Sequence, residues 1–311
     1  MHIGAACRDV APDDPQGWRL GGGVTYAALT TARLGLRTAA VVGVDAVARS
    51  ASELDLLRIA GVDIMIVPLE LGPIYHNVER PTGRVQTCVQ PSEPLPIPPL
   101  PESWLAAPAW SVAPVAGEVR DDWAEAIPAD AYVGVAWQGF LRNLDAGKHV
   151  TRKPPRPSPI LRRADLVGVS HHDVDPSTPI EALTALLAPG ALLAVTQGYE
   201  GGILVAVGED GHPGSELRYH ATATDGEVDP TGAGDTFLAA LVSTAVRRTL
   251  PGRSRGRLDL AFAAAAGSLV VEGPGLLGVP DRGQVLVRMA RQRLAQLVAP
   301  TDATRVDSYD D

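Results

Sequence analysis

A glycine-rich turn followed by an aspartate is the stretch of this sequence best suited to chemistry. Residues 228–237 read Val-Asp-Pro-Thr-Gly-Ala-Gly-Asp-Thr-Phe, and small or apolar residues at helical spacing follow from Ala233. Pro230 cannot continue a strand, whereas Gly232 and Gly234 let the backbone approach a ligand or adopt a positive φ. The pattern therefore predicts a turn that opens a helix and leaves N–H groups free at the helix start.

Free N–H groups at a helix start bind anions, and the helix dipole strengthens that binding. The neighbouring carboxylate of Asp235 would repel a static anion. The combination suits a phosphoryl group in transfer, with Asp235 accepting the proton of the attacking hydroxyl. The alternative is a structural turn, in which Asp235 only stabilises the first turn of the helix. Spacing alone does not decide between the two.

Two further polar stretches follow or precede regular elements near the N-terminus. Asp9 comes just after a strand predicted over residues 2–7, and open α/β sheets place ligands at the carboxyl ends of strands. The alternative for Asp9 is a turn in which it bonds its own backbone. Gly21, Gly22 and Gly23 precede a predicted helix. Such a triplet indicates a hinge or a close approach to a ligand, or else a flexible loop.

The remaining elements alternate between strands and helices with short connections, which predicts an α/β fold with a mostly parallel central sheet and helices on both faces. Residues 71–90 instead alternate polar and apolar side chains around a turn at 81–83, which predicts a hairpin. The basic, proline-rich segment 148–163 is either a solvated loop or a cationic rim that attracts phosphates. Further predicted elements are strands at 39–44, 62–67, 165–169, 191–195, 203–207 and 218–224 and helices at 51–60, 233–248, 258–271 and 282–298.

The composition is that of an ordinary globular protein: 311 residues, 45% hydrophobic and 20% charged. A formal net charge of -9 argues against a nucleic-acid partner and gives no support for electrostatic membrane binding. The longest weakly polar run, residues 258–271, is too short to span a bilayer. The first residues lack a signal-peptide pattern, and the two cysteines show neither a disulfide framework nor zinc spacing. We therefore expect a cytoplasmic protein.

The run Asp-Pro-Thr-Gly-Ala-Gly-Asp-Thr-Phe resembles the C-terminal signature of the PfkB (ribokinase-like) carbohydrate kinase family. Ile3-Gly4 with Arg8-Asp9-Val10 is similar to the opening of that family, and the glycines at 21–22 with Val42-Gly43-Val44-Asp45 are similar to its N-terminal pattern. The resemblance covers nearly the whole chain and is weakest between residues 91 and 163. It implies one ribokinase-like α/β kinase domain over residues 1–300, with a small β lid from about 10–22 and 66–92. The acidic tail, residues 301–311, is predicted to be disordered.

The resemblance implies ATP-dependent phosphorylation of a hydroxyl on a small sugar or polyol, with Mg²⁺ as cofactor. Asp235 would be the general base, and the backbone of Gly232, Ala233 and Gly234 the anion hole. The substrate-binding residues would be Asp9, Gly21, Gly22, Tyr26, Asn77, Arg84, Gln138 and Arg142. The nucleotide-binding residues would be Thr196, Gly198, Gly201, Thr231, Ala264, Gly267 and Ser268.

The chain departs from the family pattern at two places. Tyr26 stands where many sugar kinases carry an asparagine, which argues against ribose or a similar furanose. Ser170 and Asp173 stand in the places of Asn-x-x-Glu, which organises Mg²⁺ in the family. Asp173 is still a hard oxygen ligand for Mg²⁺, directly or through water, but it is one methylene shorter. Residues 138–142, Ser170 and the signature together look most like the myo-inositol kinases known from plants.

Two other functions stay open at this point. The first is a kinase of the same fold for a nucleoside or another heterocyclic alcohol, because Tyr26 could stack on a ring. The second is a ligand-binding protein that has lost catalysis, for which the replacements at Ser170 and Asp173 are an argument. Two neighbouring histidines, His171 and His172, do not make a zinc site, because adjacent side chains diverge and no third ligand is placed by spacing. The resemblance leaves open whether a monovalent cation or a homodimer accompanies the activity.

Overall fold

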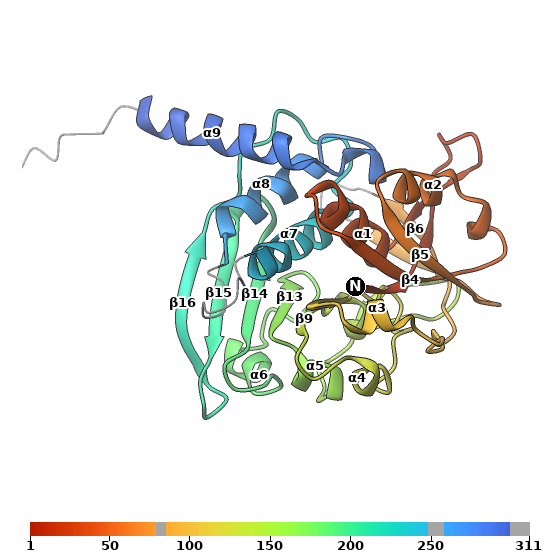
Figure 1. Cartoon of the computed structure of the whole chain (residues 1–311), viewed down its shortest axis with the longest axis horizontal. Coiled ribbons are helices and arrows are strands. Elements are labelled where there is room, and N and C mark those ends of the chain that lie inside the picture. Colours follow the sequence, from red (N-terminus) through yellow and green to blue (C-terminus); the bar gives the residue numbers. More distant parts are fainter. Residues whose placement is uncertain (79–84, 248–257, 299–311) are drawn as a thin grey trace, which may run out of the picture.

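The computed structural model describes residues 1–78, 85–247 and 258–298. A nine-stranded sheet runs through its centre, in the order β16-β15-β14-β13-β9-β8-β1-β4-β5 (Figure 1). The strands from β14 to β5 pair in parallel, and β15 and β16 add an antiparallel edge. Their bounds are β1 His2–Ala5, β4 Thr38–Val44, β5 Val62–Pro68, β8 Ala109–Val112, β9 Tyr132–Ala136, β13 Leu166–Ser170, β14 Leu192–Thr196, β15 Gly202–Val207 and β16 Pro213–Tyr219.

Helices cover both faces of this sheet, as expected (Figure 1). On one face lie α1 (Gly23–Arg33), α2 (Ser52–Ile59), α7 (Ala233–Arg247), α8 (Leu260–Val270) and α9 (Arg282–Val298). On the other face lie α3 (Glu102–Leu105), α4 (Trp123–Ala126), α5 (Pro159–Arg163) and α6 (Ile180–Thr184). Short 3₁₀ turns are η1 (Ala48–Ser50), η2 (Gln138–Leu141), η3 (Gly198–Glu200) and η4 (Gly275–Gly278).

Separate hydrophobic clusters fill the two faces. Under α3 to α6 the core contains four buried tryptophans, Trp104, Trp110, Trp123 and Trp137. Under α1 and α7 the side chains are smaller, and the two helices pack directly against each other. Small residues in α8 allow it to lie close to α7. The small-residue face therefore brings the starts of α1 and α7 together, which is where the predicted catalytic residues lie.

A second sheet of five strands stands beside the first, in the order β11-β7-β6-β2-β3. It occupies the place of the expected lid, and residues 79–84 between β6 and β7 lie outside the described residues. The strands are β2 Cys7–Val10, β3 Trp18–Gly21, β6 Ile74–Val78, β7 Val85–Gln90 and β11 Lys148–His149. The last of these comes from the basic segment and was not predicted. On either side of β11 in the chain, β10 (Arg142–Asn143) and β12 (Thr151–Arg152) pair with each other in a separate two-stranded ribbon.

One residue, Ala6, separates β1 of the central sheet from β2 of the second sheet. The expected single strand at residues 2–7 is thus two strands, and Asp9 lies within β2 instead of in a turn after a strand. The buried carboxylate of Glu118 holds this junction by accepting hydrogen bonds from the backbone N–H groups of Ala5, Val115 and Ala116. The chain therefore passes between the sheets at a fixed point.

The strand predicted at residues 218–224 lies earlier than expected, because β16 ends at Tyr219. Tyr219 pairs with Gly202, the first residue of β15, so the residues after it have no partner strand there. Helices 51–60, 258–271 and 282–298 and the strand at 62–67 are found within two residues of their predicted ends. Among the described residues, no helix combines the length and the apolar composition that crossing a bilayer requires.

Candidate active site

The glycine-rich turn opens α7, as predicted, and Tyr26 packs against it. Gly232 has φ of +82°, and a Cβ placed on it would overlap the ring of Tyr26. Tyr26 is only 2% exposed, so its ring supports the turn and has no open face for a substrate in this conformation. Gly234 differs, because a Cβ added there would meet nothing within 4 Å. The turn is therefore packed against Tyr26 at Gly232, whereas at Gly234 there is free space next to the Cα atom.

Asp229 braces the same turn from its N-terminal side. Its Oδ1 accepts a hydrogen bond from the Thr231 N–H at 2.9 Å, and its Oδ2 accepts one from the Gly275 N–H at 3.1 Å. Gly267 lets α8 pack closely against the same turn, because even a Cβ on it would lie only 3.2 Å from the Ala233 carbonyl oxygen. These contacts fix the backbone whose N–H groups would face a phosphate.

Asp235, the first acidic residue of α7, faces the start of α1. A Cβ placed on Gly23 would lie 2.8 Å from Asp235 Oδ1. Burial raises the pKa of Asp235 to about 6, while the positive charge of Arg142 lowers it and the negative charge of Asp173 raises it. A carboxylate with a pKa near 6 is charged at neutral pH yet binds a proton readily. This is the behaviour that a general base requires.

Asp9 lies in β2 of the second sheet, where neighbouring side chains hold its carboxylate. Asn77 Nδ2 donates to Asp9 Oδ1 at 3.1 Å, and Gln86 Nε2 donates to Asn77 Oδ1 at 2.7 Å. Cys7 Sγ donates to Asp9 Oδ2 at 3.5 Å. Register explains the grouping, because Asn77 pairs with Gln86 across β6 and β7 and Cys7 lies two residues from Asp9 in β2. The Asp9 carboxylate is therefore oriented by its neighbours.

The glycine triplet at 21–23 gives room to both aspartates. A Cβ on Gly21 would overlap the Asp9 carboxylate, and one on Gly23 would crowd Asp235. Between them Gly22 has φ of +106° and approaches the carbonyl of Ala5. The sequence indicated a hinge, a close approach to a ligand or a flexible loop here. The structure shows the carboxylates of Asp9 and Asp235 next to Gly21 and Gly23, and the approach of a ligand stays a prediction.

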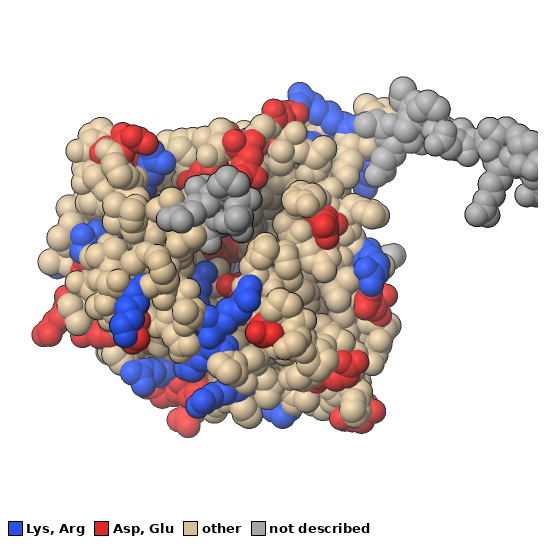
Figure 2. Space-filling model, turned by 180° about the vertical axis from the view of Figure 1, so that it is seen from behind, with Lys and Arg blue, Asp and Glu red and all other residues tan. Residues whose placement is uncertain are grey.

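Arg142 and Asp173 complete the group of charged residues. Arg142 begins β10 and pairs in register with Arg152 of β12. Its guanidinium lies 3.7 Å from Asp173 Oδ1, and the two side chains are 14% and 11% exposed. Lys and Arg side chains gather near the middle of one face of the molecule, around a hollow in which acidic atoms also show (Figure 2). The site therefore combines several carboxylates with a nearly buried cation.

The side chains present suit a magnesium ion that is shared with phosphate. Asp173 and Asp235 offer hard carboxylate oxygens, the ligands that Mg²⁺ prefers. Among the described residues, no cluster of three or more His, Cys, Asp or Glu is arranged to hold a metal by itself. A Mg²⁺ ion here would depend on donor phosphate oxygens and water for its other ligands, which is common in kinases.

The other residues named from the sequence fall into three groups. Gln138 lies in η2, before Arg142, and Arg84 lies outside the described residues. Gly198 begins η3 and Gly201 follows it, with positive φ values of +59° and +94°, and Thr196 ends β14 just before them. Ala264 and Ser268 are buried in α8 at 5% and 9% exposure. No contact in this structure assigns these residues a ligand, so the substrate-binding role of Gln138 and Arg84 and the nucleotide-binding role of the others stay predictions.

Sequence reasoning missed four residues of the site or its supports: Cys7, Gly23, Gln86 and Glu118. Cys7 could have been found from the sequence, because it lies two residues before Asp9 and alternate residues of a strand lie on the same face. Gln86 and Glu118 required the strand register and the fold, because their partners are distant in sequence. Gly23 was seen only as part of a triplet.

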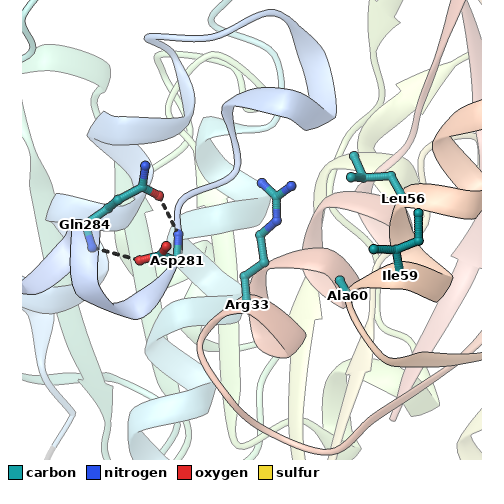
Figure 3. A pocket seen from close by; sticks show the side chains of 6 residues that line it. All are labelled: Arg33, Leu56, Ile59, Ala60, Asp281 and Gln284. Atoms are coloured by element: carbon teal, nitrogen blue, oxygen red, sulfur yellow. Dashed lines mark hydrogen bonds between the residues drawn. The ribbon is translucent and has the colours of Figure 1, made fainter.

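A hollow of about 450 Å³ lies elsewhere, between the end of α1, α2 and the start of α9 (Figure 3). Asp281 and Gln284 line it, and each accepts a hydrogen bond from the other's backbone N–H, which caps α9. Arg33 points into it and donates to the Val279 carbonyl oxygen. Its polar groups thus serve local structure, and we do not place the active site there.

Comparison with known proteins finds one matching family model. The model of the pfkB family carbohydrate kinases matches residues 163–281, which include the glycine turn and Asp235. A comparison with curated proteins finds no match to the sequence.

Solved structures share the fold over nearly the whole chain. A pyrophosphate-dependent kinase in the ribokinase family, complexed with a pyrophosphate analogue and myo-inositol, has a TM-score of 0.65 at 21% identity, covering 92% of this chain and 98% of its own. The nucleoside kinase of Methanocaldococcus jannaschii has a TM-score of 0.65 at 16% identity, covering 93% and 98%. The ribokinase of Arabidopsis thaliana, complexed with ribose and ATP, has a TM-score of 0.63 at 19% identity, covering 93% and 98%. The fold is therefore ribokinase-like.

Proposed function

We propose that this protein is a kinase that transfers a phosphoryl group from ATP to a hydroxyl of a small polyol or sugar, with an inositol-like acceptor favoured. The observation that carries the proposal is the placement of two aspartates around one glycine triplet. Asp9, on the second sheet, and Asp235, at the start of α7, occupy the space left by Gly21 and Gly23. One carboxylate can hold a substrate hydroxyl while the other removes the proton from the hydroxyl that reacts.

In the proposed reaction, the acceptor oxygen forms a bond to the terminal phosphorus of the donor as the bond to the leaving phosphate oxygen breaks. Asp235 accepts the hydroxyl proton, which its raised pKa favours. Backbone N–H groups at Gly232, Ala233 and Gly234 stabilise the charge on the transferred group, a contribution that can reach several kcal/mol. A Mg²⁺ ion near Asp173 would neutralise charge on the donor phosphates.

A polyol acceptor is favoured by the polar side chains that surround Asp9 on the second sheet. Asp9, Asn77 and Gln86 form a connected chain of hydrogen-bonding groups, which matches an acceptor that carries many hydroxyls. One structure of the same fold was solved with myo-inositol. We place Gln138 on the acceptor side too, and ribose is disfavoured because no amide stands at position 26.

A nucleoside or other heterocyclic alcohol is the alternative acceptor, supported by the likeness to a nucleoside kinase. Stacking on Tyr26 would require its buried ring to leave Gly232. The donor also needs a direct test, because structures of this fold include both an ATP complex and a pyrophosphate-dependent kinase. We retain ATP as the proposed donor, with Thr196, Gly198, Gly201, Thr231 and α8 on its nucleotide side.

The test is turnover against a panel of inositols, pentoses, hexoses and nucleosides, with Mg·ATP and magnesium pyrophosphate supplied in separate series. We expect one acceptor class to be phosphorylated, and Asp235→Asn to reduce kcat by 10³-fold or more, as loss of a general base does. Donor binding should persist in Asp235→Asn. Normal turnover in this variant would refute the assigned base. Donor binding by the wild-type protein without turnover on any acceptor would favour the ligand-binding alternative.

A further inference from the structure

The side chain of Arg142 has a capacity for hydrogen bonding that the protein does not use. A guanidinium carries five N–H donors. Its contact with Asp173 is 3.7 Å long, which is an ion pair but exceeds a hydrogen bond. Among the described residues, no hydrogen bond from this guanidinium is found. The side chain is nevertheless 14% exposed, so it is largely enclosed and yet reachable from the site.

The backbone around Arg142 holds it in this place. Lys153 N donates to the Leu141 carbonyl oxygen at 2.7 Å, and Asn143 Nδ2 donates to the Arg152 carbonyl oxygen at 3.0 Å. On the paired strand, Arg152 Nε donates to the His172 carbonyl oxygen at 2.8 Å, which ties the ribbon to the loop that carries Asp173. A cation that reaches out from a braced ribbon is preorganised for a ligand.

The charges around Arg142 define which ligand it would take. The positive charge of Arg142 acts to lower the pKa of Cys7, Tyr75 and Asp235, which come from three different elements. Asp9, Asp173 and Asp229 add further carboxylates around the same turn. A site with this many carboxylates repels a phosphate donor unless cations compensate. A polyol needs no full positive charge, whereas a phosphoryl group in transfer does.

We propose that the Arg142 guanidinium binds the phosphoryl group during transfer, instead of binding the acceptor. This inference rests on the proposed kinase function. In the step itself, the acceptor oxygen bonds to phosphorus, the donor oxygen leaves with its electron pair, and the proton goes to Asp235. Arg142 exchanges no proton and forms two parallel N–H···O bonds to the phosphoryl oxygens.

The test uses three variants of the full chain. Arg142→Gln removes charge and fork, whereas Arg142→Lys keeps the charge and loses the fork. Arg156→Gln is the matched control, because Arg156 is an exposed arginine of the basic segment 148–163, which follows Arg142 in the chain. Donor affinity is measured calorimetrically with Mg·ATP and with magnesium pyrophosphate, without acceptor.

We expect Arg142→Gln to weaken binding of the donor that the wild type binds by about 10-fold or more, with Arg156→Gln within about 2-fold of wild type. Arg142→Lys, which keeps the charge and loses the fork, should also weaken donor binding, but by less than Arg142→Gln.

Several outcomes would overturn the inference. Donor binding by both Arg142 variants at wild-type strength would do so, as would equal losses in Arg142→Gln and Arg156→Gln. Failure of the wild type to bind either donor would also exclude it. The proposed function fails separately: if the wild type binds donor through Arg142 but phosphorylates no acceptor, the inference about the phosphate stands and the kinase assignment does not.

Discussion

Burial raises the pKa of Asp235 to about 6, so at neutral pH this carboxylate is charged in surroundings that disfavour its charge. The folded state then binds the proton more tightly than the unfolded chain, whose aspartates titrate near 4. Stability from this group is therefore greatest at low pH and declines as pH rises from about 4 to about 6. An active-site residue of this kind trades stability for reactivity.

We predict that Asp235→Asn is more stable than the wild type above pH 7, by about 1–3 kcal/mol, because the amide removes the buried charge. The difference in Tm should shrink as the pH is lowered from 8 to 4. Thermal unfolding across this range measures it. Asp130→Asn, at an exposed aspartate, is the control and should show no such trend. A gap that is constant with pH would contradict the buried-charge explanation.

Single residues also separate what the sequence could predict from what it could not. The signature at 228–237 correctly placed the turn and the start of α7, because both depend on local backbone chemistry. Asp9 was singled out as a candidate site residue, but its position in a strand was missed because β2 forms only through pairing with β3 and β6. The partners of Gly21 and Gly23 were not predictable, since contacts between distant segments leave no local pattern.

At the level of elements, the start of α7 contains two glycines with opposite structural demands. Gly232 needs its positive φ and lies against Tyr26, whereas Gly234 has open space where a side chain would begin. Gly232 therefore shapes the turn, and Gly234 leaves room above it. Gly232 comes just before α7 and Gly234 lies in its first turn, which also places Asp235 next to Gly23.

We predict that Gly234→Ala folds with unchanged or slightly higher stability, since alanine favours helices by about 0.5–1 kcal/mol over glycine. It should nevertheless lower kcat/KM by 10-fold or more, because the methyl group would occupy the space left for the phosphoryl group. Gly232→Ala should lose stability by about 2 kcal/mol or more through strain and overlap with Tyr26. Thermal unfolding and steady-state kinetics distinguish them. Full activity in Gly234→Ala would place the phosphate elsewhere.

In the whole molecule, two sheets meet at Ala6, and Glu118 secures the meeting point. Its carboxylate accepts hydrogen bonds from three backbone N–H groups, those of Ala5 at the end of β1 and of Val115 and Ala116 in the loop after β8, and it is 1% exposed. The strand and helix order of the central sheet followed from sequence periodicity. The join between sheets did not, because Glu118 lies 113 residues from its partner Ala5.

We predict that Glu118→Gln costs about 2 kcal/mol or more of folding stability, because its NH₂ group would face a backbone N–H and leave both donors unpaired. Denaturant unfolding measures the loss. Glu125→Gln, at an exposed position in α4, should change stability by less than about 0.5 kcal/mol. Equal stability of the two variants would show that the junction tolerates the lost hydrogen bonds.

The glycine triplet at 21–23 has a consequence for how this protein can vary. Every missense change of a glycine codon adds at least a Cβ, so no conservative substitution exists at these three positions. At Gly21 the added atom would displace the Asp9 carboxylate, and at Gly23 it would displace that of Asp235. In a deep mutational scan, changes here should therefore abolish growth on the acceptor even where the protein accumulates normally. The scan would thus reveal the positions of the two aspartates through substitutions at neighbouring glycines, without any change to the aspartates themselves.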